Sequence, residues 1–123
     1  MGVMIVGASN NRAKFGNKAV RAYLRQGHDV IAVNPHEQAI EGVSCYQSVR
    51  HVPASDAGID RALFYVLPEV GLTIIGDLAS RGDVKELWLN PGAESDELIA
   101  AARRLGLDPV MACAIVDIGE MPG

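Results

Sequence analysis

Two hydrophobic patterns alternate along the chain, and each predicts a different element. Short apolar runs that end at Gly, Asn or Pro are typical of strands buried on both faces. They lie at Val3–Val6, Asp29–Val33, Ile59–Leu67, Val84–Leu89 and Pro109–Ile118. Apolar residues at helical spacing predict helices over Asn17–Gln26, from Pro68 to Gly82, and from the capping Ser95 to Gly106. The stretch from His36 to Gly58 predicts a loop with a short helical turn near Ser48–His51.

Strands that alternate with helical crossovers predict an α/β fold. The expected core is a doubly wound, mainly parallel five-stranded sheet with helices on both faces. Right-handed crossovers favour the strand order 3-2-1-4-5, numbered along the chain. With 123 residues and no linker or internal repeat, residues 1–123 are expected to form one domain.

In that strand order the winding reverses between the first and fourth strands, and ligands bind beyond the carboxyl ends there. Those two ends carry Gly7-Ala8-Ser9 and Asn90-Pro91-Gly92. Asn34-Pro35 closes the neighbouring second strand. The loop after the first strand also leads into a helix N-terminus, whose free N–H groups and dipole favour an anion. Three cations follow it, at Arg12, Lys14 and Lys18.

We therefore expect a phosphate-bearing ligand at the first loop, although a tight glycine turn beside solvated cations is the alternative. The usual dinucleotide motif is absent, because Gly7 is followed by Ala8-Ser9 and the next glycine is Gly16. Asn34 stands where an acidic residue would bind a ribose hydroxyl. The Gly-Lys-Ser/Thr ending of a P-loop is missing as well. These observations argue against NAD and against a P-loop nucleotide site.

Composition narrows the class of partner further. A net charge of −4 with one Trp, three Tyr and two Phe argues against nucleic-acid binding. No apolar run approaches the roughly 20 residues of a membrane span, and the N-terminus lacks a signal-peptide pattern. Cys45 and Cys113 lie far apart and are expected to be reduced, as in a cytoplasmic protein. No Cys/His spacing predicts a metal site.

Four segments carry a family resemblance: VGASNN with the later GN, GHDVIAVNP, IEGVSCYQSV and ELWLNPGAESDEL. In this order the chain resembles the small CoA-binding proteins. These are stand-alone Rossmann-type domains similar to the N-terminal domain of the succinyl-CoA synthetase alpha subunit. The resemblance implies a CoA or acyl-CoA ligand. It implies a binding protein and not an enzyme, because the phosphorylated histidine of those synthetases lies in a second domain.

The resemblance also implies site residues. The diphosphate is expected at Gly7, Ala8, Ser9, Lys14, Phe15, Gly16 and Asn17. Val33, Asn34 and Pro35 are expected to border the adenosine, with His36 where many relatives have a basic residue. The opposite wall is expected from Tyr65–Pro68.

The chain departs from the family pattern in two places. Many relatives have an arginine shortly after the third strand, whereas this chain reads FYVLPE; many also have DRC where this chain has Ala112-Cys113-Ala114. Three alternatives therefore stay open. They are a pocket for another nucleotide, a ligand-free module that binds an unknown protein partner or forms a homodimer, and an enzyme that uses Cys113 or His36.

Overall fold

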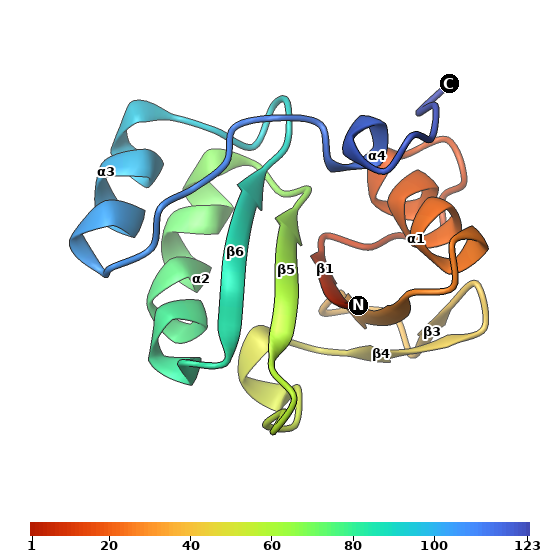
Figure 1. Cartoon of the computed structure of the whole chain (residues 1–123), viewed down its shortest axis with the longest axis horizontal. Coiled ribbons are helices and arrows are strands. Elements are labelled where there is room, and N and C mark those ends of the chain that lie inside the picture. Colours follow the sequence, from red (N-terminus) through yellow and green to blue (C-terminus); the bar gives the residue numbers. More distant parts are fainter.

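The computed structural model describes all 123 residues and contains one mostly parallel sheet between two layers of helices (Figure 1). The strands are β1 (Gly2–Val6), β2 (Asp29–Val33), β3 (Ala39–Ile40), β4 (Val43–Tyr46), β5 (Ile59–Phe64) and β6 (Val84–Leu89). Their order is β3-β4-β2-β1-β5-β6, and only β3 and β4 pair antiparallel. The predicted α/β class is confirmed.

The helices are α1 (Phe15–Arg25), α2 (Pro68–Arg81), α3 (Asp96–Arg104) and α4 (Ala114–Asp117), with a 3-10 turn, η1, at Val49–His51. Figure 1 shows α2 and α3 together on one side of the sheet and α1 with α4 on the other. Two predicted boundaries are confirmed by their chemistry. The hydroxyl of Ser95 accepts a hydrogen bond from the Leu98 N–H at the start of α3. Gly82 ends α2 in the left-handed conformation, with φ of 71°. None of the helices has the length and apolar character that a membrane span requires.

The sheet has six strands, so the prediction of five was wrong. The additional strands β3 and β4 form a hairpin inside the region that was expected to be a loop, while the predicted turn near Ser48–His51 is confirmed as η1. The hairpin turns at Glu41 and Gly42, with φ of 50° and 80°. Glutamate is uncommon at positive φ, so Glu-Gly is a much weaker hairpin signal than Asn-Gly.

The predicted strand at Pro109–Ile118 was also wrong. Only Val110 pairs, as an isolated bridge beside Trp88, before the chain crosses past the upper ends of β5 and β6 to α4 (Figure 1). The Asn90 side chain accepts the Ala114 N–H at 2.8 Å, which starts α4 instead of a strand.

The predicted neighbours were wrong as well, since Ile59–Leu67 was expected beside Asp29–Val33 and Val84–Leu89 beside Val3–Val6, whereas β5 pairs with β1 and β6 pairs with β5. The sheet is doubly wound with β4 in the place of the third strand, in the order β4-β2-β1-β5-β6. The winding therefore reverses between β1 and β5.

The sheet separates two apolar cores. Phe64, Leu89 and Leu98 belong to the core beneath α2 and α3, while Tyr23 and Ile115 belong to the core beneath α1 and α4. All five side chains are fully buried. Each helix layer is thus anchored to the sheet independently, and the carboxyl ends of the strands are held from both sides.

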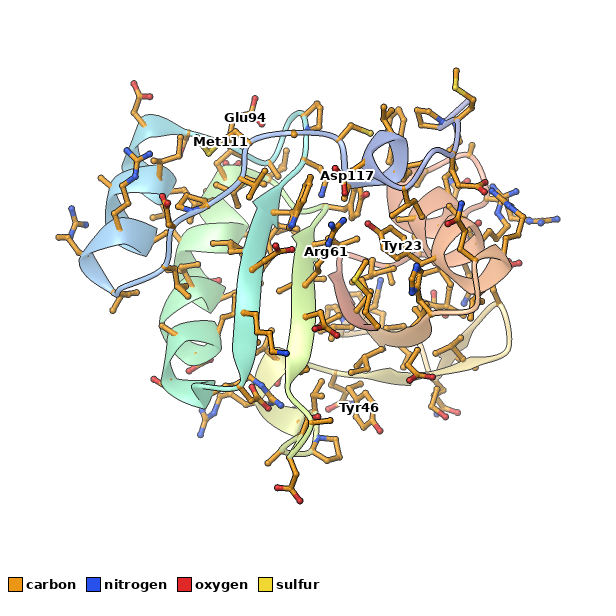
Figure 2. The ribbon with its side chains drawn as sticks, viewed as in Figure 1. Tyr23, Tyr46, Arg61, Glu94, Met111 and Asp117 are labelled. Atoms are coloured by element: carbon orange, nitrogen blue, oxygen red, sulfur yellow. The ribbon has the colours of Figure 1, made fainter.

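A polar cluster closes the second core beside α4 (Figure 2). Arg61 lies between Tyr23 and Asp117, and its Nη1 atom is 3.2 Å from the Tyr23 hydroxyl and 2.7 Å from an Asp117 carboxylate oxygen. The guanidinium also stacks over Trp88, 4.5 Å from the ring centroid. Burial raises the pKa of Tyr23 although Arg61 opposes this, so the phenol stays neutral and links α1 to β5.

Candidate functional site

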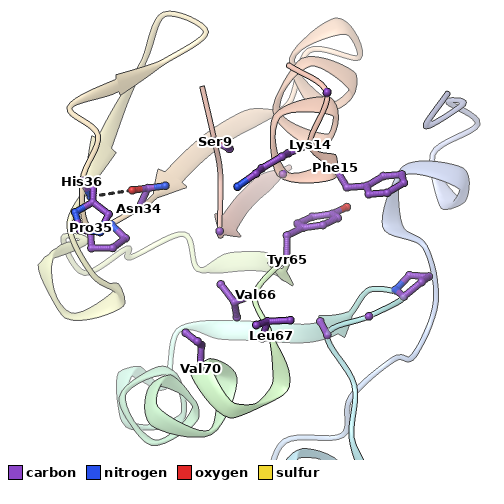
Figure 3. Close-up of a pocket in the computed structure, with 16 residues that line it drawn as sticks. Ser9, Lys14, Phe15, Asn34, Pro35, His36, Tyr65, Val66, Leu67 and Val70 are labelled. Carbon is purple, nitrogen blue, oxygen red and sulfur yellow. Dashed lines mark hydrogen bonds between the residues drawn. The ribbon is translucent and has the colours of Figure 1, made fainter. Parts of the chain in front are cut away.

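A pocket of about 680 Å³ lies beyond the carboxyl ends of β1, β2 and β5 (Figure 3). This volume is in the range of small-molecule sites, and the place is the switch point of the sheet. The lining residues are Gly7, Ser9, Ala13, Lys14, Phe15, Gly16, Asn34, Pro35, His36, Tyr65, Val66, Leu67, Val70, Pro91, Gly92 and Ala93.

Two glycines bring the start of α1 against the end of β1. Gly7 has φ of 90°, and a Cβ there would lie 2.6 Å from the carbonyl oxygen of Tyr65. A Cβ on Gly16 would overlap the carbonyl oxygen of Gly7. Helix α1 begins at Phe15, two residues earlier than predicted, so this contact falls in its first turn. No larger side chain fits either position without a backbone shift.

The loop after β1 and the start of α1 form one wall of the pocket, which is rich in unused hydrogen-bond donors. The backbone N–H groups of Ser9, Asn10, Phe15 and Gly16 donate to no acceptor in the protein. Among the cations, Lys14 lines the pocket. Arg12 instead lies 3.7 Å from Glu41, and the Lys18 ammonium sits 4.9 Å from the centre of the Phe15 ring. A helix N-terminus with free amides and one lysine is suited to a phosphate group.

The opposite wall is apolar and carries no charge. Val66, Leu67 and Val70 form it at the end of β5 and the start of α2 (Figure 3). Leu67 is 61% exposed and Val70 is 41% exposed, so both are available to cover a ligand. Tyr65 lies between the walls; its hydroxyl is buried without a hydrogen-bond partner, and burial raises the pKa of this phenol. Val70, Ala13 and Ala93 were not predicted, because their role depends on which face of a helix or loop meets the pocket.

Most of the predicted site residues are brought together here, but five are not in the lining. Ala8, Asn17, Val33 and Asn90 are buried behind it, and Pro68 of the predicted opposite wall does not line it either. Asn90 donates to the Phe64 carbonyl and accepts from the Ala114 N–H, so both ends of its amide are used. The remaining predicted residues line the pocket: Gly7, Ser9, Lys14, Phe15, Gly16, Asn34, Pro35, His36, Tyr65, Val66, Leu67, Pro91 and Gly92.

The predicted position of the crevice was wrong, because the crevice was expected between the first strand and the strand before Asn90. The strand beside β1 is β5, and the residues that face Gly7 across the switch point are therefore those following Phe64. Pro91 and Gly92 follow the next strand, β6, and reach only the rim of the same pocket.

The other reactive side chains lie apart from the pocket. His28 is 3.0 Å from the N-terminal amine, and His51 is 2.6 Å from the Ser48 hydroxyl. Cys113 is half-buried at the start of α4 and does not line the pocket. Cys45 is half-buried too, and burial raises its pKa. No three His, Cys, Asp or Glu side chains gather closely enough to hold a metal ion.

A family model and a solved structure both match nearly the whole chain. The family model described as "CoA binding domain" matches residues 2–118. A conserved hypothetical protein from Pyrococcus furiosus has a similar solved structure. The two are 37% identical, with a TM-score of 0.83, over 94% of this chain and 97% of the other.

Two further matches cover only part of a larger protein. The alpha subunit of the ADP-forming acetate–CoA ligase II of Pyrococcus furiosus is 35% identical over 66 residues, which are 53% of this chain and 14% of that subunit. The dinucleotide-forming acetyl-coenzyme A synthetase 1 of Ca. Korarchaeum cryptofilum, solved with phosphate and ADP, is 28% identical with a TM-score of 0.75. That match covers 90% of this chain and 25% of the synthetase.

Proposed function

This chain belongs to the CoA binding domain family, and on that premise we propose that it binds CoA or acyl-CoA in the pocket between β1 and β5. The observation that carries the proposal is the pairing of two unlike walls. One wall has free backbone amides and Lys14, and the facing wall is apolar and uncharged. CoA has the matching character, since its charged diphosphate is joined to a flat adenine and a long pantetheine arm.

The proposed pose follows the placement of these groups. The diphosphate lies at the amides of Ser9 and Gly16 beside Lys14. The adenosine lies along Asn34–His36, against Val66 and Leu67 of the apolar wall. Apart from Lys14, His36 is the only basic side chain of the lining, so it is the proposed partner of the 3′-phosphate.

Magnitudes indicate that both walls are needed. Micromolar binding requires about 8 kcal/mol of net free energy. Hydrogen bonds to a charged group contribute roughly 1.5–3 kcal/mol each, while association costs on the order of 4–15 kcal/mol. Burying about 150 Å² of adenine adds roughly 4 kcal/mol at ~25 cal/mol per Å². The phosphate loop alone is therefore insufficient, and the apolar wall supplies the remainder.

We further propose that the chain holds its ligand without chemical turnover. The ionisable side chains of the lining are Lys14, His36 and Tyr65. Covalent catalysis requires a nucleophile hydrogen-bonded to a base, whereas the Ser9 hydroxyl accepts from the Asn11 N–H and is not paired with His36. This composition supports a carrier, a sensor or an accessory subunit rather than a transferase.

The test is a calorimetric titration with CoA, dephospho-CoA and NAD in one buffer. Tight binding of CoA, weaker binding of dephospho-CoA and no heat from NAD are the expected results. Lys14→Gln is expected to weaken CoA about tenfold, because one charge-assisted contact is lost. Lys18→Gln is the matched control, since Lys18 lies one turn further along, in α1, and does not line the pocket. Absence of heat with all three ligands would contradict the proposal.

A second candidate is a nucleotide without the 3′-phosphate. The uncharged wall after β5 favours it, because Val66 and Leu67 add no charge and the basic side chains of the lining are only Lys14 and His36. Equal affinities for CoA and dephospho-CoA would support this candidate.

A further inference from the structure

The loop that faces the proposed diphosphate has no regular secondary structure between Gly7 and Ala13, yet side chains hold three of its carbonyl groups. The Asn34 amide donates to the Ala8 carbonyl at 2.8 Å, and the Asn17 amide donates to the Ser9 carbonyl at 2.8 Å. Arg21 donates to the Arg12 carbonyl at 2.9 Å. The loop is therefore fixed through its oxygen atoms.

Fixing a carbonyl also fixes the amide that shares its peptide plane. The peptide bonds are all trans, so each N–H points opposite to the carbonyl of the preceding residue. Holding the Ala8 and Ser9 carbonyls thus sets the directions of the Ser9 and Asn10 N–H groups. Both of these N–H groups are without an acceptor. An approaching anion meets donors there, because the oxygen lone pairs are already engaged.

Asn17 is anchored well enough to perform this role. It is fully buried in the first turn of α1, and its Oδ1 atom accepts from Arg21 Nε at 2.7 Å. Its Nδ2 group also lies 3.2 Å from a carboxylate oxygen of Glu41, at the turn of the β3–β4 hairpin. Asn34 is anchored similarly, since its Oδ1 atom accepts the His36 N–H at 2.8 Å. Neither side chain is free to rotate toward a ligand without breaking these bonds.

We propose that Asn17 and Asn34 are positioning residues that make the loop an anion receptor: their amides hold the Ala8 and Ser9 carbonyls, and the loop consequently offers N–H groups to the diphosphate. This role rests on the proposed function. In dinucleotide-binding folds an acidic residue at the place of Asn34 binds a ribose hydroxyl. The proposal gives Asn34 a different role, which is to hold the loop. Both asparagines act on the diphosphate through the backbone, and Asn34 also lines the part of the pocket where the adenosine is proposed to lie.

Aspartate substitutions isolate this role. Asn17→Asp and Asn34→Asp keep the accepting oxygen and the size of each side chain but remove the donor to the loop. The added charge needs a control, and Asn11→Asp provides it. Asn11 lies in the same loop, and its one side-chain hydrogen bond is accepted by Oδ1 from the Ala13 N–H, which a carboxylate preserves.

Two measurements decide the question. The first is the affinity for CoA, which is expected to fall at least about 30-fold in Asn17→Asp and Asn34→Asp but less than about fivefold in Asn11→Asp. The second is ¹⁵N relaxation of the ligand-free proteins. The order parameters of the Ser9 and Asn10 amides are expected to drop below about 0.6 in the first two variants and to stay near the wild-type values in the control.

The outcomes separate the two proposals. If wild type binds CoA and all three variants bind it equally well, or if the loop stays equally rigid in all of them, the positioning role is overturned. If wild type does not bind CoA, the proposed function itself fails. Should Asn17→Asp fail to fold, Asn34→Asp tests the same role from a loop position outside the helix.

Discussion

At the amino-terminal end of the sheet every donor of Arg81 is used, whereas at the carboxyl-terminal end several backbone amides have no acceptor in the protein. Arg81 binds both carboxylate oxygens of Asp83 and the carbonyls of Val49, Val52 and Pro53, at distances of 2.7–3.0 Å. The Ser55 N–H adds a further bond to Asp83 at 3.1 Å. The free amides of the other end lie in the loop after β1 and at the start of α1.

The difference indicates that one end of the sheet contributes stability and the other end is available for ligand binding. A hydrogen bond made inside the protein contributes roughly 0.5–1.5 kcal/mol of net stability, which amides that face solvent do not contribute. Those amides are instead available to a ligand, which replaces water as their acceptor. We therefore expect substitutions at the amino-terminal end to change stability without changing ligand affinity, and substitutions at the carboxyl-terminal end to change ligand affinity.

The largest effect on stability is expected from removing the hydrogen bonds of Arg81 at the amino-terminal end. Arg81→Leu leaves the Asp83 carboxylate and three carbonyls without their partner in a nearly buried site, and is expected to lower the free energy of unfolding by about 3 kcal/mol. Urea unfolding followed by circular dichroism measures this change. The CoA affinity of the folded fraction is expected to stay within about twofold of wild type, and a larger loss would contradict the division between the two ends.

A smaller effect is expected at the close contact of the binding end. Gly16→Ala places a methyl group against the Gly7 carbonyl, so α1 must move away from β1. We expect a loss of about 1–3 kcal/mol in stability, with CoA affinity falling more than about tenfold as the amides shift. Gly76→Ala is the control, because its Cβ would meet nothing within 4 Å on the surface of α2. That variant is expected to gain about 0.5–1 kcal/mol in stability and to bind normally.

The smallest expected effect is a pH dependence of stability that arises from Asp83 at the amino-terminal end. Burial opposes ionisation of Asp83, yet its bonds to Arg81 and to the Ser55 N–H hold its pKa below the ordinary value. A lowered pKa stabilises the fold above the unfolded-state value of about 3.9 and loses that stabilisation as the pH falls through the folded-state value. Stability measured between neutral pH and the acid range is therefore expected to fall less steeply in Asp83→Asn than in wild type. Parallel curves for the two proteins would contradict this assignment.

The sequence was informative where a local signal acts alone. Pro68, Gly82 and Ser95 set helix boundaries through their own backbone or hydroxyl chemistry, and α2 and α3 were located accurately. The run Pro109–Ile118 is apolar enough for a strand, but the Asn90 side chain takes the Ala114 N–H and starts a helix there. A bond between residues so far apart in sequence leaves no local pattern.

In the site, too, residues with a local sequence signal were predictable and residues placed by long-range contacts were not. Gly7, Lys14 and Gly16 were predictable because a glycine loop before a helix has a recognisable spacing. The facing wall was predictable only through the family resemblance, since the identity of the strand next to β1 depends on the missed hairpin. The roles of Asn17 and Asn34 required the structure, because one amide can equally well touch a ligand or a carbonyl group.

The apolar wall has a thermodynamic consequence. Leu67 and Val70 are in contact with water when the pocket is empty of ligand, and a ligand that covers them removes that hydration. Apolar burial lowers the heat capacity whereas polar burial raises it, so the binding enthalpy of CoA should become more favourable on warming. Inorganic pyrophosphate, which engages only the amides and Lys14, should show the opposite trend. The temperature dependence of a heat of binding thus reports which wall a ligand uses.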